Sequence, residues 1–347
     1  MERQQRIESW LGQLWPGVSF SLAPASADAS FRRYFRATRG DGSTRIIMDA
    51  PPSHEDVKPW LHVQQLFHDA GVHVPEVEAQ DLEQGFLLLS DLGNSTYLSV
   101  LNGEDPASAR PLYLDAIDAL IRIQQASRPG QLPDYDRALL KRELDLFPEW
   151  YLGKHVKLAL DDKLAKALEN CFERIMVVNL AEPKVFVHRD YHSRNLMIVP
   201  QGQNPGIIDF QDAVYGPISY DLVSLLKDAY IAWDEEVLLD WLITYWERAR
   251  KAGLPISADF ASFHRDFEWM GVQRHVKVLG IFARLYHRDG KDGYLKDMPL
   301  VAHYLRKAVT RYDELSPLRK VLDLVENKIT VLGYTMDQQV VKGANGK

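Results

Sequence analysis

Residues 187–195 read Val187-His188-Arg189-Asp190-Tyr191-His192-Ser193-Arg194-Asn195, and residues 207–210 read Ile207-Ile208-Asp209-Phe210. Each stretch continues a short apolar run of the kind that forms buried strands. Asn195 follows Asp190 by five positions, and Asp209 follows it by nineteen. Magnesium-dependent phosphoryl transfer needs an Asp that orients and deprotonates the attacking hydroxyl, and oxygen side chains that hold the metal. The spacing therefore predicts Asp190 as general base, with Asn195 and Asp209 as Mg²⁺ ligands.

The triplet His-Arg-Asp also occurs at residues 264–266 and 287–289, which provides an internal control. Five positions after Asp266 stands Gly271, and five positions after Asp289 stands Tyr294, so neither copy has the metal-binding amide. We expect the second copy at the start of a long helix and the third in a loop after that helix. The triplet alone therefore carries little information, and the prediction rests on the spacing of the three residues above.

The other polar residues around the motif have less specific patterns. We expect His188 to pack and hydrogen-bond behind the catalytic loop, and Asp221 to cap a helix and tether that loop. His192 is either a contact to substrate or phosphate or a packing residue. Asp212 is a candidate second metal or substrate ligand. Arg194 is expected to be solvated or held in a salt bridge.

The 347-residue chain has the composition of a globular protein, with 46% hydrophobic and 26% charged residues. Its formal net charge of −7 argues against a general nucleic-acid binder, because phosphate contacts need a basic surface. Cys171 is the single cysteine and stands in a helical pattern, so we expect it in the core. The N-terminus lacks the apolar segment of a signal peptide, and no apolar run reaches the ~20 residues of a spanning helix. We therefore expect a cytoplasmic protein.

The length suggests two domains or lobes. The first part is rich in strand patterns: a helix over 5–15, an Ala- and Ser-rich loop over 23–30, strands over 34–38 and 45–49 joined by Gly40-Asp41-Gly42, a helix over 55–70, and strands over 74–77 and 86–89. Helical patterns follow over 108–126, 161–177, 219–231, 235–252, 258–286 and 297–313, with short strands over 184–187 and 206–208. This order predicts an α+β fold.

Residues 187–197 with Ile208-Asp209-Phe210 resemble the aminoglycoside phosphotransferase and choline kinase-like branch of the protein kinase fold, in which a second His stands two positions after the Asp. The resemblance implies a bilobal fold: a nucleotide-binding N-lobe over 1–89, a hinge over 90–93, a helical C-lobe with the catalytic loop and acceptor site over 94–330, and a tail over 331–347. It also implies ATP and Mg²⁺ as cofactors, Asp190 as base, and Asn195 and Asp209 on the metal. Hinge backbone around Leu89 and Asp91 would then contact the adenine.

Finer features resemble one group within this family. They are Met48-Asp49-Ala50-Pro51-Pro52, Leu89-Ser90-Asp91-Leu92-Gly93 and the stretch over residues 209–217. The group consists of bacterial anomeric kinases that phosphorylate N-acetylmuramate and N-acetylglucosamine at C1 during peptidoglycan recycling. The resemblance implies a small-molecule sugar as substrate. An aminoglycoside kinase, or a kinase for another small-molecule alcohol, is the alternative within the same class.

One departure from the family concerns the nucleotide phosphates. The family usually carries a Lys on the third strand, but this chain has Ile46-Ile47-Met48-Asp49 there. Arg32, Arg33 and Arg36 are candidates to replace it, because a guanidinium suits phosphate well. The preceding loop, residues 26–34, is not glycine-rich. Glu55 and Asp56 are either partners for that cation or first-turn charges that complement a helix dipole.

The predicted helix over 258–286 offers cations for an acceptor site. Arg274, Lys277 and Arg284 are three and seven positions apart, which places them near one face. One hypothesis is that Arg274 and Lys277 bind an acidic substituent of the sugar, such as a lactyl carboxylate. The alternative is an ordinary solvated face.

Three other functions are compatible with parts of the sequence. His188, Asp190 and His192 alternate as metal ligands can, which would suit a metallohydrolase. The absent Lys would suit a nucleotide-binding pseudokinase, although the retained Asp190, Asn195 and Asp209 argue against one. A protein kinase fits less well, because Gln211 follows Asp209-Phe210 and no Ala-Pro-Glu segment follows.

Overall fold

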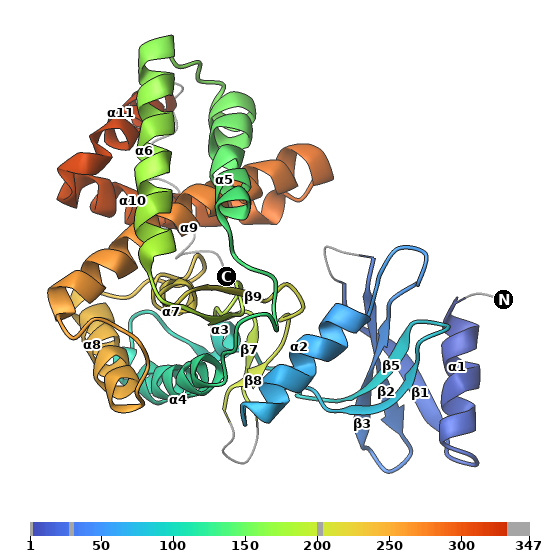
Figure 1. The fold of residues 1–347 in the computed structure, drawn as a ribbon. Helices are drawn as coiled ribbons and strands as arrows, with labels where there is room; N and C mark the ends of the chain where they lie inside the picture. Colours follow the sequence, from blue (N-terminus) through green and yellow to red (C-terminus); the bar gives the residue numbers. More distant parts are fainter. Residues whose placement is uncertain (1–2, 28–30, 200–203, 332–347) are drawn as a thin grey trace.

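The computed structural model describes residues 3–27, 31–199 and 204–331, which form two distinct parts (Figure 1). A five-stranded sheet with two helices makes up the first part, and the second part is mainly helical. The predicted α+β fold is therefore confirmed. The predicted tail over 331–347, apart from its first residue, lies outside the described residues, as do residues 28–30 of the predicted loop.

The sheet is antiparallel throughout, in the order β1-β2-β3-β5-β4. Its strands are β1 (Phe20–Ala27), β2 (Arg33–Arg39), β3 (Thr44–Asp49), β4 (Val77–Asp81) and β5 (Phe86–Ser90), and its helices are α1 (Arg3–Leu14) and α2 (Lys58–Asp69). The predicted hairpin joins β2 to β3, and Gly42 in its turn has the positive φ of 83° that glycine tolerates.

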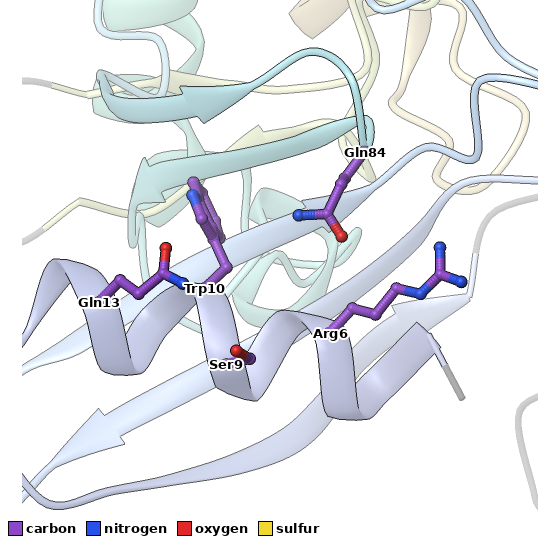
Figure 2. A pocket seen from close by; sticks show the side chains of 5 residues that line it. All are labelled: Arg6, Ser9, Trp10, Gln13 and Gln84. Carbon is purple, nitrogen blue, oxygen red and sulfur yellow. The ribbon is translucent and has the colours of Figure 1, made fainter. Parts of the chain in front are cut away.

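Alternation of side chains gives the sheet two different faces. The outer face carries Ile47 and packs with Trp10 of α1 in a small hydrophobic core. The inner face carries Met48 and Leu89, which belong to the main core of the protein. Beside α1, a cavity of about 260 Å³ is lined by Arg6, Ser9, Trp10, Gln13 and Gln84 (Figure 2). Successive residues of β2 and β3 therefore face alternately toward α1 and toward the second part of the chain.

The second part consists of helices with short strands between them (Figure 1). Its helices are α3 (Tyr97–Val100), α4 (Pro106–Gln125), α5 (Arg137–Leu146), α6 (Asp162–Ala181), α7 (Tyr220–Leu226), α8 (Glu235–Lys251), α9 (Phe260–Asp289), α10 (Met298–Arg311) and α11 (Ser316–Val331), with a π-helix η1 (Phe147–Val156) after α5. Strand β6 (Lys184–Val187) pairs with β9 (Val214–Pro217), and β7 (Leu196–Met197) pairs with β8 (Gly206–Ile207). Among the described helices, none is long and apolar enough to cross a membrane.

Helix α9 is the central element of the second part. It is 30 residues long and contacts α5, α6, α7, α10 and η1, and every side chain from Phe267 to Gly280 is buried. A Cβ on Gly280 would lie 2.6 Å from the backbone carbon of Leu146, so this glycine permits the close packing of α9 on α5. Charged residues in the buried stretch, such as Lys277, must find partners inside the protein.

Several predicted boundaries were wrong. Strand β1 covers Ala23 to Ala27, where we expected a loop, because pairing with β2 overrides the weak strand preference of Ala, Ser and Pro. Helix α2 begins at Lys58 rather than at residue 55, and Pro59 lies in its first turn, where proline is tolerated. Glu55 and Asp56 therefore precede the helix, and Glu55 accepts a hydrogen bond from the backbone N–H of Phe31 (3.1 Å).

The C-terminal half holds further differences. Helix α7 ends at Leu226, five residues before its predicted end, and the triplet at 287–289 forms the last turn of α9 rather than a loop. Gly290 ends that helix with a positive φ of 68°. Helices α5 and α11, the π-helix η1 and strands β7 and β9 were not predicted. Cys171 is buried as expected, and burial raises the pKa of its thiol to about 11.

Candidate active site

A buried carboxylate anchors the chain that follows β6. Asp221, in the first turn of α7, accepts hydrogen bonds from the backbone N–H groups of His188 (2.6 Å) and Arg189 (3.0 Å). Arg189 has a positive φ of 77°, which a non-glycine residue keeps only where its surroundings impose it. Burial raises the pKa of Asp221 to about 6. The tether that we expected between this helix and the catalytic loop is present.

His188 packs behind the loop, as expected. Its Nδ1 accepts from the backbone N–H of Asp190 (3.2 Å), and its Nε2 donates to the carbonyl oxygen of Ile208 (3.0 Å). Burial lowers the pKa of His188, so the neutral ring suits one accepted and one donated bond. Both ring nitrogens are engaged, which argues against His188 as a metal ligand and against a metallohydrolase. Among the residues that the structure describes, no three His, Cys, Asp or Glu side chains group as metal ligands.

The pairing of β7 with β8 brings Asn195 and Asp209 together. The N–H of Ile208 donates to the carbonyl oxygen of Asn195 (3.1 Å), directly before Asp209. The Asn195 Nδ2 donates to the Asp190 carbonyl oxygen (3.0 Å) and to Asp209 Oδ2 (3.2 Å). The amide oxygen of Asn195 and the carboxylate of Asp209 are hard oxygen ligands of the kind that Mg²⁺ prefers, so these residues fit the expected metal.

A cavity of about 470 Å³ lies between the inner face of the sheet and the catalytic loop. Ile46 and Leu89 of the sheet line it from one side, and Asn195 and Asp209 line it from the other. Asp91, directly after β5, also lines it. Its volume and its mixed apolar and polar walls are typical of a small-molecule site. Leu89 and Asp91, the two residues predicted at the adenine, thus lie in one cavity with the two predicted metal ligands.

The register of β2 and β3 separates the three candidate arginines. Arg33 lies on the outer face, where its Nε donates to Asp49 (3.1 Å), away from the cavity. Arg36 lines the cavity, but its Nε and Nη2 both bind the Asp91 carboxylate (2.6 and 3.0 Å). Arg32 directly precedes β2 and is partly exposed. On β3 itself, the side chains that face inward are Ile46 and Met48. This strand therefore presents apolar side chains to the inner face and no cation in place of the family's Lys.

Arg194 is a further cation in the wall of the cavity. Among the described residues that line it, the cationic ones are Arg36 and Arg194. The Arg194 guanidinium lies 3.6 Å from the ring centroid of Tyr230 and 3.7 Å from the Asp297 carboxylate. The expectation of a salt-bridged arginine is met, but the side chain also faces the cavity that holds Asn195 and Asp209.

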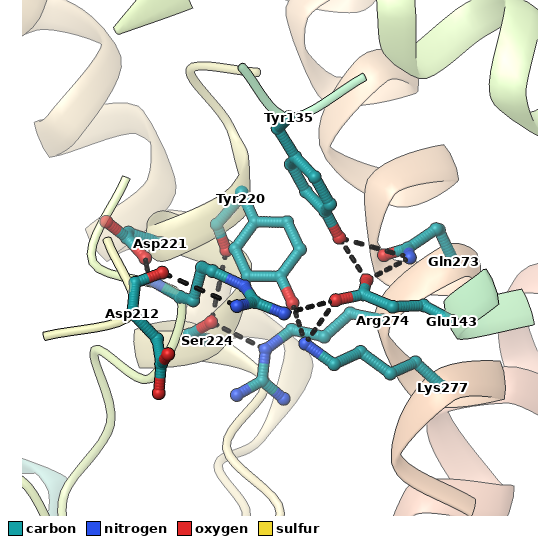
Figure 3. A network of polar contacts seen from close by, with 10 residues as sticks. Tyr135, Glu143, Asp212, Tyr220, Asp221, Ser224, Gln273, Arg274 and Lys277 are labelled. Carbon is teal, nitrogen blue, oxygen red and sulfur yellow. Dashed lines mark hydrogen bonds and ion pairs between the residues drawn. The ribbon is translucent and has the colours of Figure 1, made fainter. Parts of the chain in front are cut away.

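A polar network joins α5, α7 and α9 (Figure 3). Its centre is Glu143 of α5, whose Oε1 contacts the Arg189 Nη2 (2.6 Å) and the Lys277 Nζ (3.1 Å). The Glu143 Oε2 accepts from Gln273 (3.0 Å) and from the hydroxyl of Tyr135. Burial opposes the ionisation of Glu143, but Lys277 and Arg189 hold its pKa below the usual value. The site therefore contains a buried, ionised carboxylate between two cations.

Arg274 and Lys277 point inward, so the alternative of a solvated face is wrong for both. They are 3% and 6% exposed. Burial opposes the ionisation of Asp190, but the charge of Lys277, with contributions from His192 and Arg274, lowers its pKa to about 2. Asp190 is therefore ionised at neutral pH, and both α9 cations lie close enough to act on it.

The two remaining candidates have different surroundings. His192 is partly buried, with its ring centroid 5.3 Å from that of Tyr230. Burial lowers the pKa of His192. Asp212 is exposed; its carbonyl oxygen accepts from Arg189 Nη1 (3.4 Å), and its carboxylate accepts from Gln211 (3.4 Å). Figure 3 shows that carboxylate directed away from Glu143.

Sequence reasoning missed two carboxylates that shape the site. Glu143 lies on a helix that we did not predict, 47 positions before Asp190. Asp228 follows α7, and its Oδ2 accepts from the backbone N–H of Ser193 in the catalytic loop (2.9 Å). Neither stands in a recognisable motif, because each acts through chain segments that meet only in the folded protein.

Comparison with known proteins agrees with this geometry. The model of the phosphotransferase enzyme family matches residues 21–254. An N-acetylmuramate/N-acetylglucosamine kinase of Neisseria meningitidis serogroup B is 50% identical over 337 residues, which cover 96% of this chain and 100% of that protein. A protein of the same name from Pseudomonas aeruginosa is 47% identical and covers 92% of this chain and 96% of that one.

Solved structures share the fold at low sequence identity. The choline kinase LicA from Streptococcus pneumoniae superposes with a TM-score of 0.61 at 13% identity, over 90% of this chain and 98% of that one. The ADP-bound aminoglycoside phosphotransferase APH(2'')-Ib has a TM-score of 0.56 at 16% identity, over 88% of this chain and 98% of that one.

Proposed function

This chain belongs to the phosphotransferase enzyme family, and on that premise we propose that it transfers the γ-phosphoryl group of ATP to the C1 hydroxyl of an N-acetylated amino sugar. The observation that carries the proposal is that Asn195 and Asp209 line one cavity, and that the Asn195 amide donates both to the Asp209 carboxylate and to the backbone carbonyl of Asp190. The relatives that are named as N-acetylmuramate/N-acetylglucosamine kinases support the choice of sugar.

Asp190 would act as the general base. Its low pKa keeps it ionised, so it would accept a hydrogen bond from the attacking hydroxyl and take its proton as the new bond from the sugar oxygen to the γ-phosphorus forms and the bond from that phosphorus to the ADP oxygen breaks. Asn195 and Asp209 would hold Mg²⁺, which supplies charge stabilisation for the phosphates. Asp221 and His188 fix the loop, so that the base and the metal ligands keep their positions during turnover.

The cavity between the sheet and the catalytic loop would hold the nucleotide. We infer that Leu89 and Asp91 lie at the adenine and that the phosphates extend toward Asn195 and Asp209. Arg194, which lines this cavity, is the best-placed candidate for phosphate contacts, and Arg32 stays a candidate from the sequence; Arg33 faces α1, and Arg36 is bound by Asp91. His192, Asp212 and Arg274 would lie on the acceptor side, together with Lys277, which is paired with Glu143. A cytoplasmic location, where ATP is available, fits this reaction.

A panel assay tests the proposal. The protein is incubated with ATP, Mg²⁺ and either N-acetylglucosamine, N-acetylmuramate or an aminoglycoside, and phosphorus NMR locates the new phosphate. We expect a sugar 1-phosphate, and a loss of at least about 10³-fold in turnover for Asp190→Asn, the order that a general base contributes. Phosphorylation of the aminoglycoside alone would contradict the proposed substrate, and no ATP consumption with any acceptor would contradict the proposed reaction.

A further inference from the structure

Arg274 is a buried cation whose terminal nitrogens lack partners. Its Nε donates to the Ser224 Oγ (2.5 Å), and its side chain lies inside α9 at 3% residue exposure. To the residues that the structure describes, its Nη1 and Nη2 make no hydrogen bond and no ion pair. Figure 3 shows both nitrogens directed out of the dashed network, away from Glu143 and Tyr220. Neither nitrogen is among the buried, unpartnered polar atoms of the described residues, so the end of the guanidinium is open to solvent and can meet an anion from outside the chain.

Lys277, one turn further along the same helix, differs in this respect. Its Nζ contacts the Glu143 carboxylate (3.1 Å) and donates to the Tyr220 hydroxyl (2.8 Å). Arg189 is likewise paired with Glu143 (2.6 Å). The charges of these two cations are therefore already partnered within the protein. Of these three cations, Arg274 is therefore the one whose terminal nitrogens bind none of the described residues and can bind a ligand.

The position of Arg274 points to the acceptor rather than to the nucleotide. Its charge acts on Asp190 and on His192, two residues of the catalytic loop. It is not among the described residues that line the cavity between the sheet and the catalytic loop. An anionic group that reaches its terminal nitrogens would thus be carried by the molecule whose hydroxyl Asp190 deprotonates.

We propose that the Arg274 guanidinium binds the carboxylate of an acidic amino sugar, and that Lys277 is a positioning residue that acts through Glu143. This inference rests on the proposed function and deepens it by assigning one specificity residue. A guanidinium presents two parallel N–H donors that match a carboxylate, which a neutral sugar lacks. Arg274 would therefore favour N-acetylmuramate, with its lactyl carboxylate, over N-acetylglucosamine.

The test compares kcat/KM for these two sugars in the wild type, Arg274→Met, Arg274→Lys and Lys277→Met. For Arg274→Met we expect the ratio of the acidic to the neutral sugar to fall about 100-fold, mainly through KM. Arg274→Lys keeps the charge but loses the paired donors, so a fall of about tenfold is expected. Lys277→Met should lower kcat for both sugars by a similar factor and leave the ratio within about threefold of the wild type.

Melting temperatures provide a second readout that does not need turnover. Because the Arg274 charge favours the ionised form of Asp190, the free Arg274→Met variant should melt somewhat below the wild type. The additional stabilisation that N-acetylmuramate gives the wild type should then be lost. If Arg274→Met has the same ratio of kcat/KM for the acidic to the neutral sugar as the wild type, the inference is overturned and the proposed function still stands. An unchanged ratio with equal losses on both sugars would indicate that Arg274 contacts the transferred phosphoryl group instead. Turnover of neither sugar by the wild type would overturn both.

Discussion

Glu143→Gln removes the one negative charge at the centre of the polar network that joins α5, α7 and α9. The wild-type carboxylate is 5% exposed and contacts Lys277 (3.1 Å) and Arg189 (2.6 Å) through a single oxygen. Glutamine keeps the volume and can still accept one of the bonds from Tyr135 and Gln273. It cannot neutralise the two cations, however, and its amide N–H₂ group would face donors.

The cost follows from that geometry. Removing one partner of a buried ion pair destabilises a protein by about 3–5 kcal/mol, because the remaining charge stays buried and unpaired. We expect about 4 kcal/mol for Glu143→Gln, since the two cations remain near each other. That is a large part of the ~5–15 kcal/mol that ordinarily separates folded from unfolded protein, and for a chain of this length it corresponds to a fall of roughly 5 °C in the melting temperature.

Urea unfolding measures this effect directly. The matched control is Glu169→Gln, which removes a carboxylate from an exposed pair with Lys166 (2.7 Å) on α6 and should leave the free energy of unfolding nearly unchanged. The double variant Glu143→Gln/Lys277→Met should be more stable than the sum of the two single changes predicts, by at least about 1 kcal/mol, because it removes a charge of each sign. A loss in Glu143→Gln no larger than in Glu169→Gln would refute the view that this carboxylate is ionised and essential to the packing of α5 on α9.

Three further outcomes are expected. Arg194→Met should raise the KM for ATP by about tenfold, because the side chain is a cation in the wall of the nucleotide cavity; an unchanged KM would remove it from the phosphate site. Gly280→Ala should destabilise the fold by about 2 kcal/mol through its overlap with Leu146, whereas Gly271→Ala, whose Cβ would meet nothing closer than 3.6 Å, should be neutral or stabilising, and equal melting temperatures would contradict this. Burial raises the pKa of Glu182 to about 8, so the folded state keeps a proton that the unfolded state loses above pH 4.5, and stability should fall by up to roughly 5 kcal/mol between pH 4.5 and 8. Glu182→Gln should flatten that dependence in urea titrations at several pH values, and a slope like that of the wild type would show that Glu182 is not its source.

The sequence by itself was sufficient to predict that Asp190, Asn195 and Asp209 would lie near one another. Asp190 and Asn195 belong to one short loop, and Asp209 follows a strand that pairs with the strand after Asn195. Their relative positions depend on local chain geometry, so spacing along the chain predicts them. The apolar periods of the long helices and the turn at Gly40-Asp41-Gly42 are local features of the same kind, and they predicted the α+β order of elements.

Only the tertiary structure decided the surroundings of that centre. The spacing of Arg274 and Lys277 is the same whether a helix face meets water or a protein core, and the packing of α9 against α5 and α7 decided that both are buried. Glu143 pairs with Lys277 across 134 positions of chain, a contact that no local pattern indicates. Strand parity likewise separated Arg33 from Arg36 only once the register was known. Burial and long-range pairing depend on which surfaces pack together in the folded chain. That packing places charged side chains near Asp190 and so determines its pKa.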